Sequence, residues 1–369
     1  MTAPLHIVVL GLSLSSSWGN GHATTYRALL RGLATLGHRI TFLERDVPWY
    51  ASSRDLADPD FCDLRLYADL AELETHVATI RDADAVIVGS YVPDGPAVID
   101  RVLEIARGVV AFYDIDTPVT LAQLARGETP SLEPRQIPLI DVYLSFTGGP
   151  TLDLLERVHG ARAARALYCS VEPERYEPTG EPYAYDLGYL GTYSPDRQPT
   201  LDALLIEPAR RLPEMRFVVA GPQYPDDIAW PANVARIPHL PPAEHPSFYA
   251  RQRFTLNVTR ADMIAAGWSP SVRLFEAGAC GTAIVGDDWE GLGALLPDGE
   301  AMLVARGTDD VVAILTETPQ ARRDAIAAEA RARVLAGHTG AARARELVAA
   351  IDEAAAARAT PARKRTAGS

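Results

Sequence analysis

Residues 269–288, SPSVRLFEAGACGTAIVGDD, decide the fold of this chain. The stretch is typical of a capped helix that leads into a buried strand. Ser269 is predicted to cap the helix, and Pro270 suits the first helical position, because the N–H that proline lacks would have no partner there. Gly281 can adopt the left-handed turn that ends a helix, and the apolar residues 282–286 then predict a short strand.

Two charged residues stand out on this otherwise apolar helix. Arg273 and Glu276 are three positions apart and therefore share one face. A buried helix that carries this pair, and whose first N–H groups are unpaired, suits a phosphate and a sugar hydroxyl together. The alternative is a plain ion pair on a half-exposed helix, and the spacing does not decide between the two.

Working outward from this stretch, predicted strands and helices alternate in two series. Short β-branched strands without polar alternation are typical of parallel sheets. The fold class is therefore α/β, with two Rossmann-like domains facing across a cleft and ligands at the C-terminal ends of the strands. The first series has strands at 5–12, 39–43, 85–89, 108–113, 140–145 and 164–168, and helices at 24–36, 68–81 and 97–106. The second has strands at 185–190, 216–220, 234–237, 254–258, 282–286 and 303–306, and helices at 199–211, 246–250, 318–335 and 340–357.

Size, charge and cysteine content restrict the class of protein. A chain of 369 residues exceeds the size of most single cores and indicates two domains. The net charge of −13 argues against nucleic acid or an anionic membrane as the partner. Cys62, Cys169 and Cys280 fit no metal-binding spacing and indicate reduced thiols in the cytoplasm. No window reaches the roughly 18 apolar residues of a membrane span.

Three groups of polar residues follow predicted strands of the first half. The loop after the first strand contains Trp18-Gly19-Asn20-Gly21-His22, whose glycines permit close backbone approach and whose histidine, at a helix start, is a candidate general base. Asp114 and Asp116 directly follow the strand at 108–113 and could hold hydroxyls or a proton. Tyr91 follows another strand. The alternatives are a capping histidine, turn-forming aspartates and a loop-filling tyrosine.

The second half places its candidates after successive strands in the same way. Gly191 and Thr192 follow a strand and, together with Arg197, suit a diphosphate. Arg260 is a second cation after the strand at 254–258, and His239 stands where a nucleobase could lie. Both arginines could instead be solvated surface charges.

Taken together, these residues resemble a known family. RLFEAGACGTAIV, residues 273–285, is similar to the sugar-nucleotide-binding segment of the GT-B glycosyltransferases. With YDIDTPVT at 113–120 and SVEPERY at 170–176, the chain looks most like the CgeB-like (spore maturation protein-like) branch, and the resemblance covers nearly the full length. It implies a hexosyltransferase that takes a nucleotide-diphosphate sugar as donor, with an unknown acceptor that is a small molecule, a glycan or a protein.

The resemblance also implies residue roles and domain limits. Glu276 would bind the donor ribose, and the diphosphate would be held by the backbone at Gly191 and Thr192 and by Arg260 and Arg273. The main chain at His239 and Leu240 would meet the base. His22 or Asp116 would face the sugar and acceptor, beside the loop residues Gly19, Asn20, Gly21 and Tyr91. The implied domains are an acceptor-binding domain at 1–175, a donor-binding domain at 176–340, a helix packing across both at 341–358 and a disordered tail at 359–369.

Two departures from the family pattern bear on mechanism. Retaining members carry an acidic residue eight positions before the ribose glutamate, where this chain has Trp268. They also use an Arg–Lys pair on the diphosphate, whereas Lys364 in the tail is the only lysine here. A direct displacement with His22 or Asp116 as base is then the more natural expectation. Arginines and amides would neutralise the leaving diphosphate, so we expect no metal and no cofactor.

Three other functions remain open from the sequence. A sugar-nucleotide 2-epimerase-like enzyme could use the same scaffold without an acceptor, and a non-catalytic binder would explain the missing acid at Trp268. A dinucleotide dehydrogenase could use Glu44, at the end of the second strand, as its ribose-binding acid. However, the first loop is GLSLSSSWGNG rather than GxGxxG.

Overall fold

The computed structural model describes residues 3–18, 21–129 and 131–359, which form two compact units. The first unit joins the chain up to Leu167 to the segment that begins at Gly340. The second unit comprises Tyr168–Thr339. The disorder expected for the tail concerns residues that lie almost entirely outside the described part.

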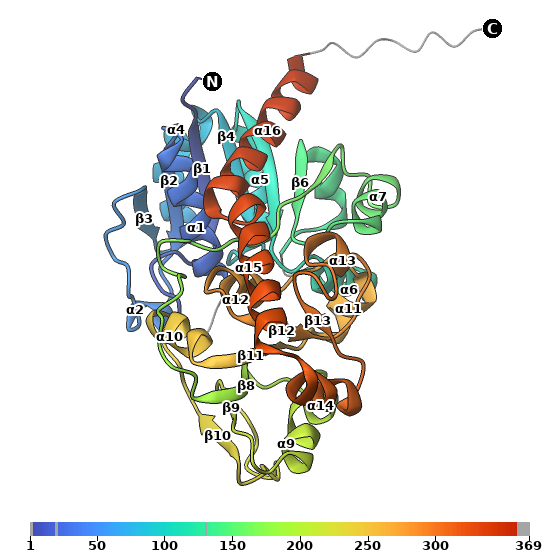
Figure 1. The fold of residues 1–369 in the computed structure, drawn as a ribbon. Helices are drawn as coiled ribbons and strands as arrows, with labels where there is room; N and C mark the ends of the chain where they lie inside the picture. Colours follow the sequence, from blue (N-terminus) through green and yellow to red (C-terminus); the bar gives the residue numbers. More distant parts are fainter. Residues whose placement is uncertain (1–2, 19–20, 130, 360–369) are drawn as a thin grey trace, which may run out of the picture. The chain divides into compact units, whose positions relative to one another are not determined.

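The first unit is built on one sheet of parallel strands in the order β3-β2-β1-β4-β5-β6-β7 (Figure 1). The central strands are buried along their whole length, which agrees with their uniformly apolar sequences. The strands are β1 (His6–Gly11), β2 (Arg39–Arg45), β3 (Asp63–Tyr67), β4 (Ala85–Gly89), β5 (Val109–Asp114), β6 (Val142–Ser145) and β7 (Ala164–Ala166).

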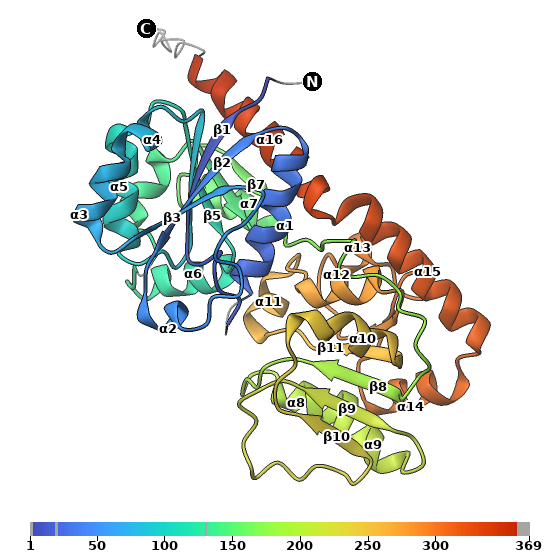
Figure 2. The same cartoon turned by 90° about the vertical axis from the view of Figure 1, so that its left-hand side faces the viewer.

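Helices cover both faces of this sheet, and the last helix of the chain is one of them. Figure 2 shows α1 and α16 along one face and α3, α4 and α5 on the other. A Cβ on Gly32 of α1 would lie 2.3 Å from the carbonyl oxygen of Gly340, so only glycine permits this close contact of α1 and α16. The helices are α1 (His22–Thr35), α2 (Pro48–Ala51), α3 (Leu70–Leu73), η1 (Glu74–His76), α4 (Val77–Arg81), α5 (Gly95–Ile105), α6 (Thr117–Ala125), η2 (Pro134–Leu139), α7 (Pro150–Arg157) and α16 (Gly340–Ala359).

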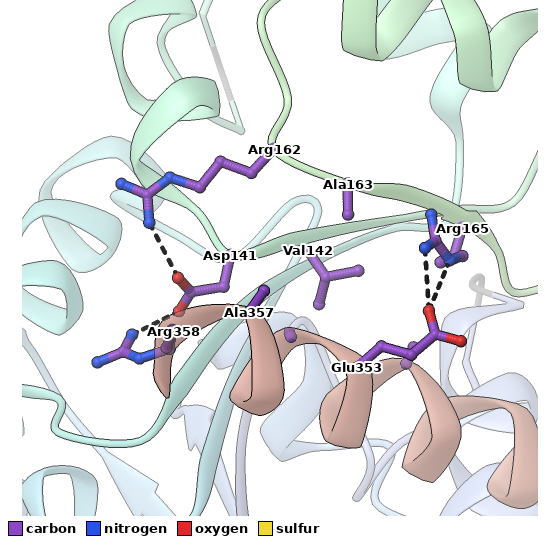
Figure 3. A pocket seen from close by; sticks show the side chains of 10 residues that line it. Asp141, Val142, Arg162, Ala163, Arg165, Glu353, Ala357 and Arg358 are labelled. Atoms are coloured by element: carbon purple, nitrogen blue, oxygen red, sulfur yellow. Dashed lines mark hydrogen bonds and ion pairs between the residues drawn. The ribbon is translucent and has the colours of Figure 1, made fainter. Parts of the chain in front are cut away.

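Ion pairs fasten the C-terminal part of α16 at the start of β6 and along β7. Asp141, whose side chain is buried, lies 3.0 Å from Arg162 and 2.6 Å from Arg358 of α16. Arg165 of β7 lies 2.9 Å from Glu353. These pairs wall a cavity of about 330 Å³ over an alanine-lined stretch of the helix (Figure 3). The cavity lies beside the first residues of β6 and β7, at the opposite edge of the sheet from the strand ends that carry the candidate residues.

The second unit has its own parallel sheet, in the order β10-β9-β8-β11-β12-β13 (Figure 1). Two separate Rossmann-like sheets confirm the predicted fold class. The strands are β8 (Tyr185–Leu190), β9 (Phe217–Ala220), β10 (Val234–Ile237), β11 (Gln252–Asn257), β12 (Ala283–Gly286) and β13 (Leu303–Val304). The helices are α8 (Gln198–Leu201), η3 (Asp202–Ile206), α9 (Glu207–Arg211), η4 (Pro242–Glu244), α10 (His245–Ala250), α11 (Ala261–Ala266), α12 (Val272–Ala279), α13 (Leu292–Leu295), α14 (Thr308–Glu317) and α15 (Gln320–Gly337).

The helix at the centre of the prediction begins two residues later than expected. Ser271, rather than Ser269, caps α12 by accepting a hydrogen bond from the Arg273 N–H at 3.2 Å. The reason lies upstream, where Trp268 has a φ of +46° and the Ser269 hydroxyl donates to the carbonyl of Gly267. This left-handed turn delays the helix. Its predicted end is confirmed, because Gly281 has a φ of +70°.

Other differences concern short or interrupted helices. The helix predicted over 68–81 is divided into α3, η1 and α4. The helix predicted over 318–335 begins at Gln320. Thr318 is the C-cap of α14, and Pro319 takes the N-cap position of α15. Within the described residues, no helix combines the length and the apolar character that a membrane span needs.

Candidate functional site

In the second unit the loop after β8 makes backbone contact with the loop after β9. The Gly191 N–H donates to the carbonyl of Ala220 at 2.9 Å. Gly221 has a φ of +138°, and a Cβ there would lie 2.0 Å from the Gly191 carbonyl oxygen. Glycine is therefore required at position 221 for the two strand ends to approach this closely.

Two side chains donate hydrogen bonds to the backbone carbonyl groups of this loop. The Tyr224 hydroxyl donates to the Gly191 carbonyl at 3.1 Å, and Arg197 Nη2 donates to the Thr192 carbonyl at 2.7 Å. In the described structure the Thr192 N–H has no hydrogen-bond partner. The loop thus has its acceptors satisfied and a donor available, which is the polarity that an anionic ligand requires.

Three arginines lie near the same loop. Burial lowers the pKa of the Arg197 guanidinium below its ordinary value, and the charges of Arg273 and Arg260 act in the same direction. Nε of Arg197 is buried and has no hydrogen-bond partner among the described residues. Arg260 lies 3.9 Å from Asp196, which also accepts from the N–H of Ala261 at 3.0 Å. The neighbourhood of Arg197 is therefore positively charged, and Asp196 offsets that charge in part.

Glu276 is buried in a group of tyrosines rather than paired with Arg273. Tyr176 donates to Oε1 at 2.9 Å, and Tyr249 donates to Oε2 at 3.1 Å. His245 Nδ1 lies 3.6 Å from Oε2. Burial acts to raise the pKa of this carboxyl, but His245, Arg273 and Tyr176 outweigh it and hold the pKa below the ordinary value. The carboxylate is therefore charged, and the simple Arg–Glu ion pair is not what the described residues show.

An aromatic cluster beside the loop was not predicted from the sequence. The Arg236 guanidinium lies 4.1 Å from the ring centre of Tyr224 and 4.4 Å from that of Trp230. Arg236 also donates to the carbonyls of Val219 and Gly221 at 3.1 and 3.3 Å. The cluster braces the ends of β9 and β10 against the glycine loop.

The two residues predicted to meet a nucleobase follow β10. His239 is exposed and Leu240 is half-buried. Neither makes a side-chain contact that fixes a role, so their assignment stays a prediction.

In the first unit the structure brings three of the predicted residues together. Nε2 of His22 lies 3.8 Å from Oδ2 of Asp116, and the imidazole meets the Tyr91 ring edge-on at 5.4 Å. His22 begins α1, Asp116 precedes α6, and Tyr91 follows β4 with a φ of +62°. The imidazole is mostly buried, and its Nδ1 has no hydrogen-bond partner. Gly21 precedes α1, whereas Gly19 and Asn20 lie outside the described residues.

Asp114, predicted as a catalytic residue, is enclosed by other side chains, and a catalytic role for it stays a prediction. It is fully buried and accepts hydrogen bonds from Tyr143 at 2.6 Å and Thr120 at 2.8 Å. Burial raises the pKa of its carboxyl to about 6. Asp114 is the last residue of β5, and its carboxylate also accepts from the N–H of Asp116. The buried side chain therefore supports the turn that carries Asp116.

Glu44 shapes the loop that leads to His22. It is completely buried and accepts from the N–H groups of Leu14 and Ser15 at 2.6 and 2.8 Å. The hydroxyls of Ser13 and Ser15 also donate to the carboxylate, at 3.3 and 2.6 Å, so its four acceptor positions are used. No position is then left for a ribose hydroxyl, which removes the basis for a dinucleotide site. Sequence analysis placed Glu44 at the strand end but could not identify its partners.

The described residues contain no cluster of three or more His, Cys, Asp or Glu side chains able to hold a metal ion. Among the described residues, Cys62 and Cys280 take part in no disulfide.

Comparisons with known proteins give one family match and several structures of the same fold. Residues 197–349 match a family described as glycosyl transferase-like. No protein of curated function matches the sequence significantly. Sucrose-phosphate synthase from Thermosynechococcus elongatus superposes with a TM-score of 0.66 at 14% identity, over 96% of this chain and 100% of that one.

Two further solved structures share the fold. HepE from Anabaena, in complex with UDP and glucose, gives a TM-score of 0.68 at 12% identity, over 95% of this chain and 100% of its own. AviGT4, a glycosyltransferase involved in avilamycin A biosynthesis, gives a TM-score of 0.64 at 16% identity, over 96% of this chain and 98% of that one. The chain therefore has the GT-B fold. The CgeB-like branch stays a prediction.

Proposed function

We propose, from the premise that residues 197–349 are a glycosyl transferase-like domain in a chain of GT-B fold, that this protein transfers a sugar from a nucleotide-diphosphate donor to an acceptor hydroxyl. The single observation that supports it most is the cation site of the second unit. There Arg197 donates to the Thr192 carbonyl, Arg260 and Arg273 lie near enough for their charges to act on Arg197, and the Thr192 N–H has no partner among the described residues. Two phosphates suit this site, because they accept from both guanidiniums and backbone amides.

The ribose would be recognised by Glu276. Each carboxylate oxygen can accept more than one hydrogen bond, so a ribose hydroxyl can join the tyrosines already bound to it. Because Glu276 is buried and charged, a hydroxyl donor gains a stronger hydrogen bond than it would make with water. The HepE complex contains UDP, which makes uridine the first base to test.

The proposed reaction is a direct displacement. The acceptor oxygen forms a bond to the anomeric carbon while the bond from that carbon to the diphosphate oxygen breaks, and its electron pair leaves on the diphosphate. His22 takes the acceptor proton, and Asp116 at 3.8 Å stabilises the imidazolium that results. The arginines offset the charge on the leaving group, so the proposal includes no metal and no cofactor.

Titration calorimetry with UDP, ADP, GDP and dTDP tests the donor site. One of these should bind, and Arg197→Ala should weaken that affinity about ten- to a hundredfold, as expected for a charge-assisted hydrogen bond. Absence of binding to all four would refute the proposal. We also propose a cytoplasmic location, because three widely separated cysteines are typical of reduced thiols.

The chemistry is tested by following nucleotide-sugar turnover with NMR. His22→Ala should lower turnover at least about a hundredfold and leave the affinity for the diphosphate unchanged. A sugar released with inverted anomeric configuration supports direct displacement, and retention would exclude it. An epimerised donor would identify an epimerase instead, and binding without turnover in the presence of acceptors would identify a non-catalytic binder.

A further inference from the structure

Two tryptophans of the first unit are exposed next to the candidate catalytic residues. Trp18 is 58% exposed and Trp49 is 56% exposed, although indole side chains are ordinarily well covered in folded domains. Trp18 lies in the loop after β1, four residues before His22, and Trp49 lies in α2 after β2. Because β1 and β2 are adjacent parallel strands, both indoles lie at the C-terminal edge of the sheet.

The two loops are tied to each other by hydrogen bonds. The carbonyl of Ser15 accepts from the N–H groups of Asp55 and Leu56 at 3.1 and 3.0 Å. The Ser16 hydroxyl donates to the carbonyl of Ser53 at 2.8 Å. These contacts make the loops one surface, which we call the tryptophan platform: residues 12–18 and 46–58 with Trp18 and Trp49.

A buried ion pair holds the platform on the body of the unit. Arg27 of α1 makes two hydrogen bonds to Asp55, at 2.7 and 2.9 Å, and donates twice to the carbonyl of Leu14. The Arg27 side chain is only 7% exposed. The Ser17 side chain and N–H also bind Asp55, at 2.8 and 3.0 Å. Exposed aromatic rings on loops fixed this firmly are preorganised for a ligand.

The residues around the indoles restrict the ligand. Besides Asp55, which is paired with Arg27, residues 52–60 expose Asp58 and Asp60, and these acidic groups disfavour phosphate-rich or anionic ligands. Among the described residues of the platform, Trp18 and Trp49 are the only large apolar side chains that are exposed, which is less apolar surface than a lipid layer requires. Flat apolar rings surrounded by hydroxyl and carboxylate groups complement a sugar ring, whose C–H face is apolar and whose edge carries hydroxyl donors.

We propose that the tryptophan platform binds a neutral oligosaccharide and that the acceptor of the reaction is therefore a glycan. The inference rests on the proposed transferase function, since it assigns the substrate class of that same site. One sugar ring stacks on each indole, and the exposed carboxylates receive hydroxyl hydrogen bonds at its edge. The acceptor hydroxyl is then offered to His22, on the helix that follows the platform loop.

An array of immobilised neutral and acidic glycans, probed with the fluorescently labelled full chain, tests the proposal. The wild type should bind neutral oligosaccharides, and Trp18→Ala and Trp49→Ala should each reduce that signal at least about tenfold, as for the central residue of an interface. Trp49→Tyr should retain much of it, because the ring face is kept. Leu154→Ala on α7, where the leucine is 41% exposed in the same unit, is the matched control and should change nothing.

Calorimetry with nucleoside diphosphates on the same samples separates the two ideas. All tryptophan variants should bind the diphosphate as the wild type does. If the wild type binds a diphosphate but no neutral glycan, or if glycan binding is unaffected in both alanine variants, the glycan inference is wrong and the transferase proposal stands. Tryptophan-dependent binding to phosphatidylcholine vesicles in place of glycans would also overturn it. If no diphosphate binds, the transferase proposal itself fails.

Discussion

Tyr224 shows how a single hydroxyl can determine the polarity of a binding loop. Its hydrogen bond to the Gly191 carbonyl fixes the plane of the peptide that joins Gly191 to Thr192, so the Thr192 N–H of the same peptide points in the opposite direction. Tyr224→Phe keeps the ring that supports Arg236 but removes the bond. We expect the affinity for a nucleoside diphosphate to fall about five- to tenfold, the value of one hydrogen bond, with little change for the corresponding nucleoside.

Tyr193→Phe is the matched control for this prediction. Tyr193 packs on Tyr224 at 5.6 Å between ring centres, and its hydroxyl makes no hydrogen bond among the described residues. Calorimetry should give this variant the same affinity for a nucleoside diphosphate as the wild type. An equal loss of affinity for nucleoside and diphosphate in Tyr224→Phe would mean that the hydroxyl only supports the fold.

Asp114 makes the stability of the first unit depend on pH. Its pKa is raised by burial to about 6 in the folded protein from the ordinary value of 3.8, so the folded state binds the proton more tightly than the unfolded state. The resulting contribution to the free energy of unfolding is fully present below pH 4 and is lost as the pH rises through 6. By proton linkage this loss amounts to about 3 kcal/mol. Thermal melts between pH 4 and 7 should show the wild type losing this increment relative to Asp114→Asn. Parallel pH profiles of the two proteins would show that Asp114 does not titrate in this window.

At the scale of elements, the sequence predicted strands better than helix starts. β4, β8 and β10 have the predicted limits, because short apolar runs bounded by turns leave little freedom. The start of α12 was misplaced because the left-handed Trp268 is imposed by contacts with the distant residues Glu290 and Gly291. Such contacts leave no local pattern.

In the candidate site, too, local patterns were predictable and long-range contacts were not. The proximity of His22 and Asp116 was predictable because each follows a strand, and parallel strands end at one edge of the sheet. The enclosure of Asp114 was not, because it depends on long-range contacts. Tyr224 and Arg236 were missed because their importance lies in a stacked contact between two loops.

Asp141 should be the residue on which the docking of α16 depends most. It joins Arg162 and Arg358 of α16, whose side chains are half-exposed, and the N–H of Val110 around one buried carboxylate. Asp141→Asn leaves the two guanidiniums facing a neutral amide, and because both can still reach water the loss should be about 2 kcal/mol, the value of hydrogen bonds to a charged group. Denaturant unfolding measures the loss. Glu353→Gln, which removes an exposed pair with Arg165, is the control and should cost less than about 1 kcal/mol. Similar losses in both variants would contradict a special role for Asp141.

At the scale of the whole molecule, each unit has its own sheet and its own core, so the two should unfold in separable steps. A nucleoside diphosphate at a hundred times its dissociation constant should stabilise only the second unit, by about 2.7 kcal/mol. Asp141→Asn should lower only the transition of the first unit, because every partner of that carboxylate belongs to it. Differential scanning calorimetry of the wild type and variant, with and without UDP, gives both shifts in one experiment. A single transition that moves with both perturbations would show instead that the units unfold as one cooperative body, and the assignment of donor binding to the second unit would then need a directly located nucleotide.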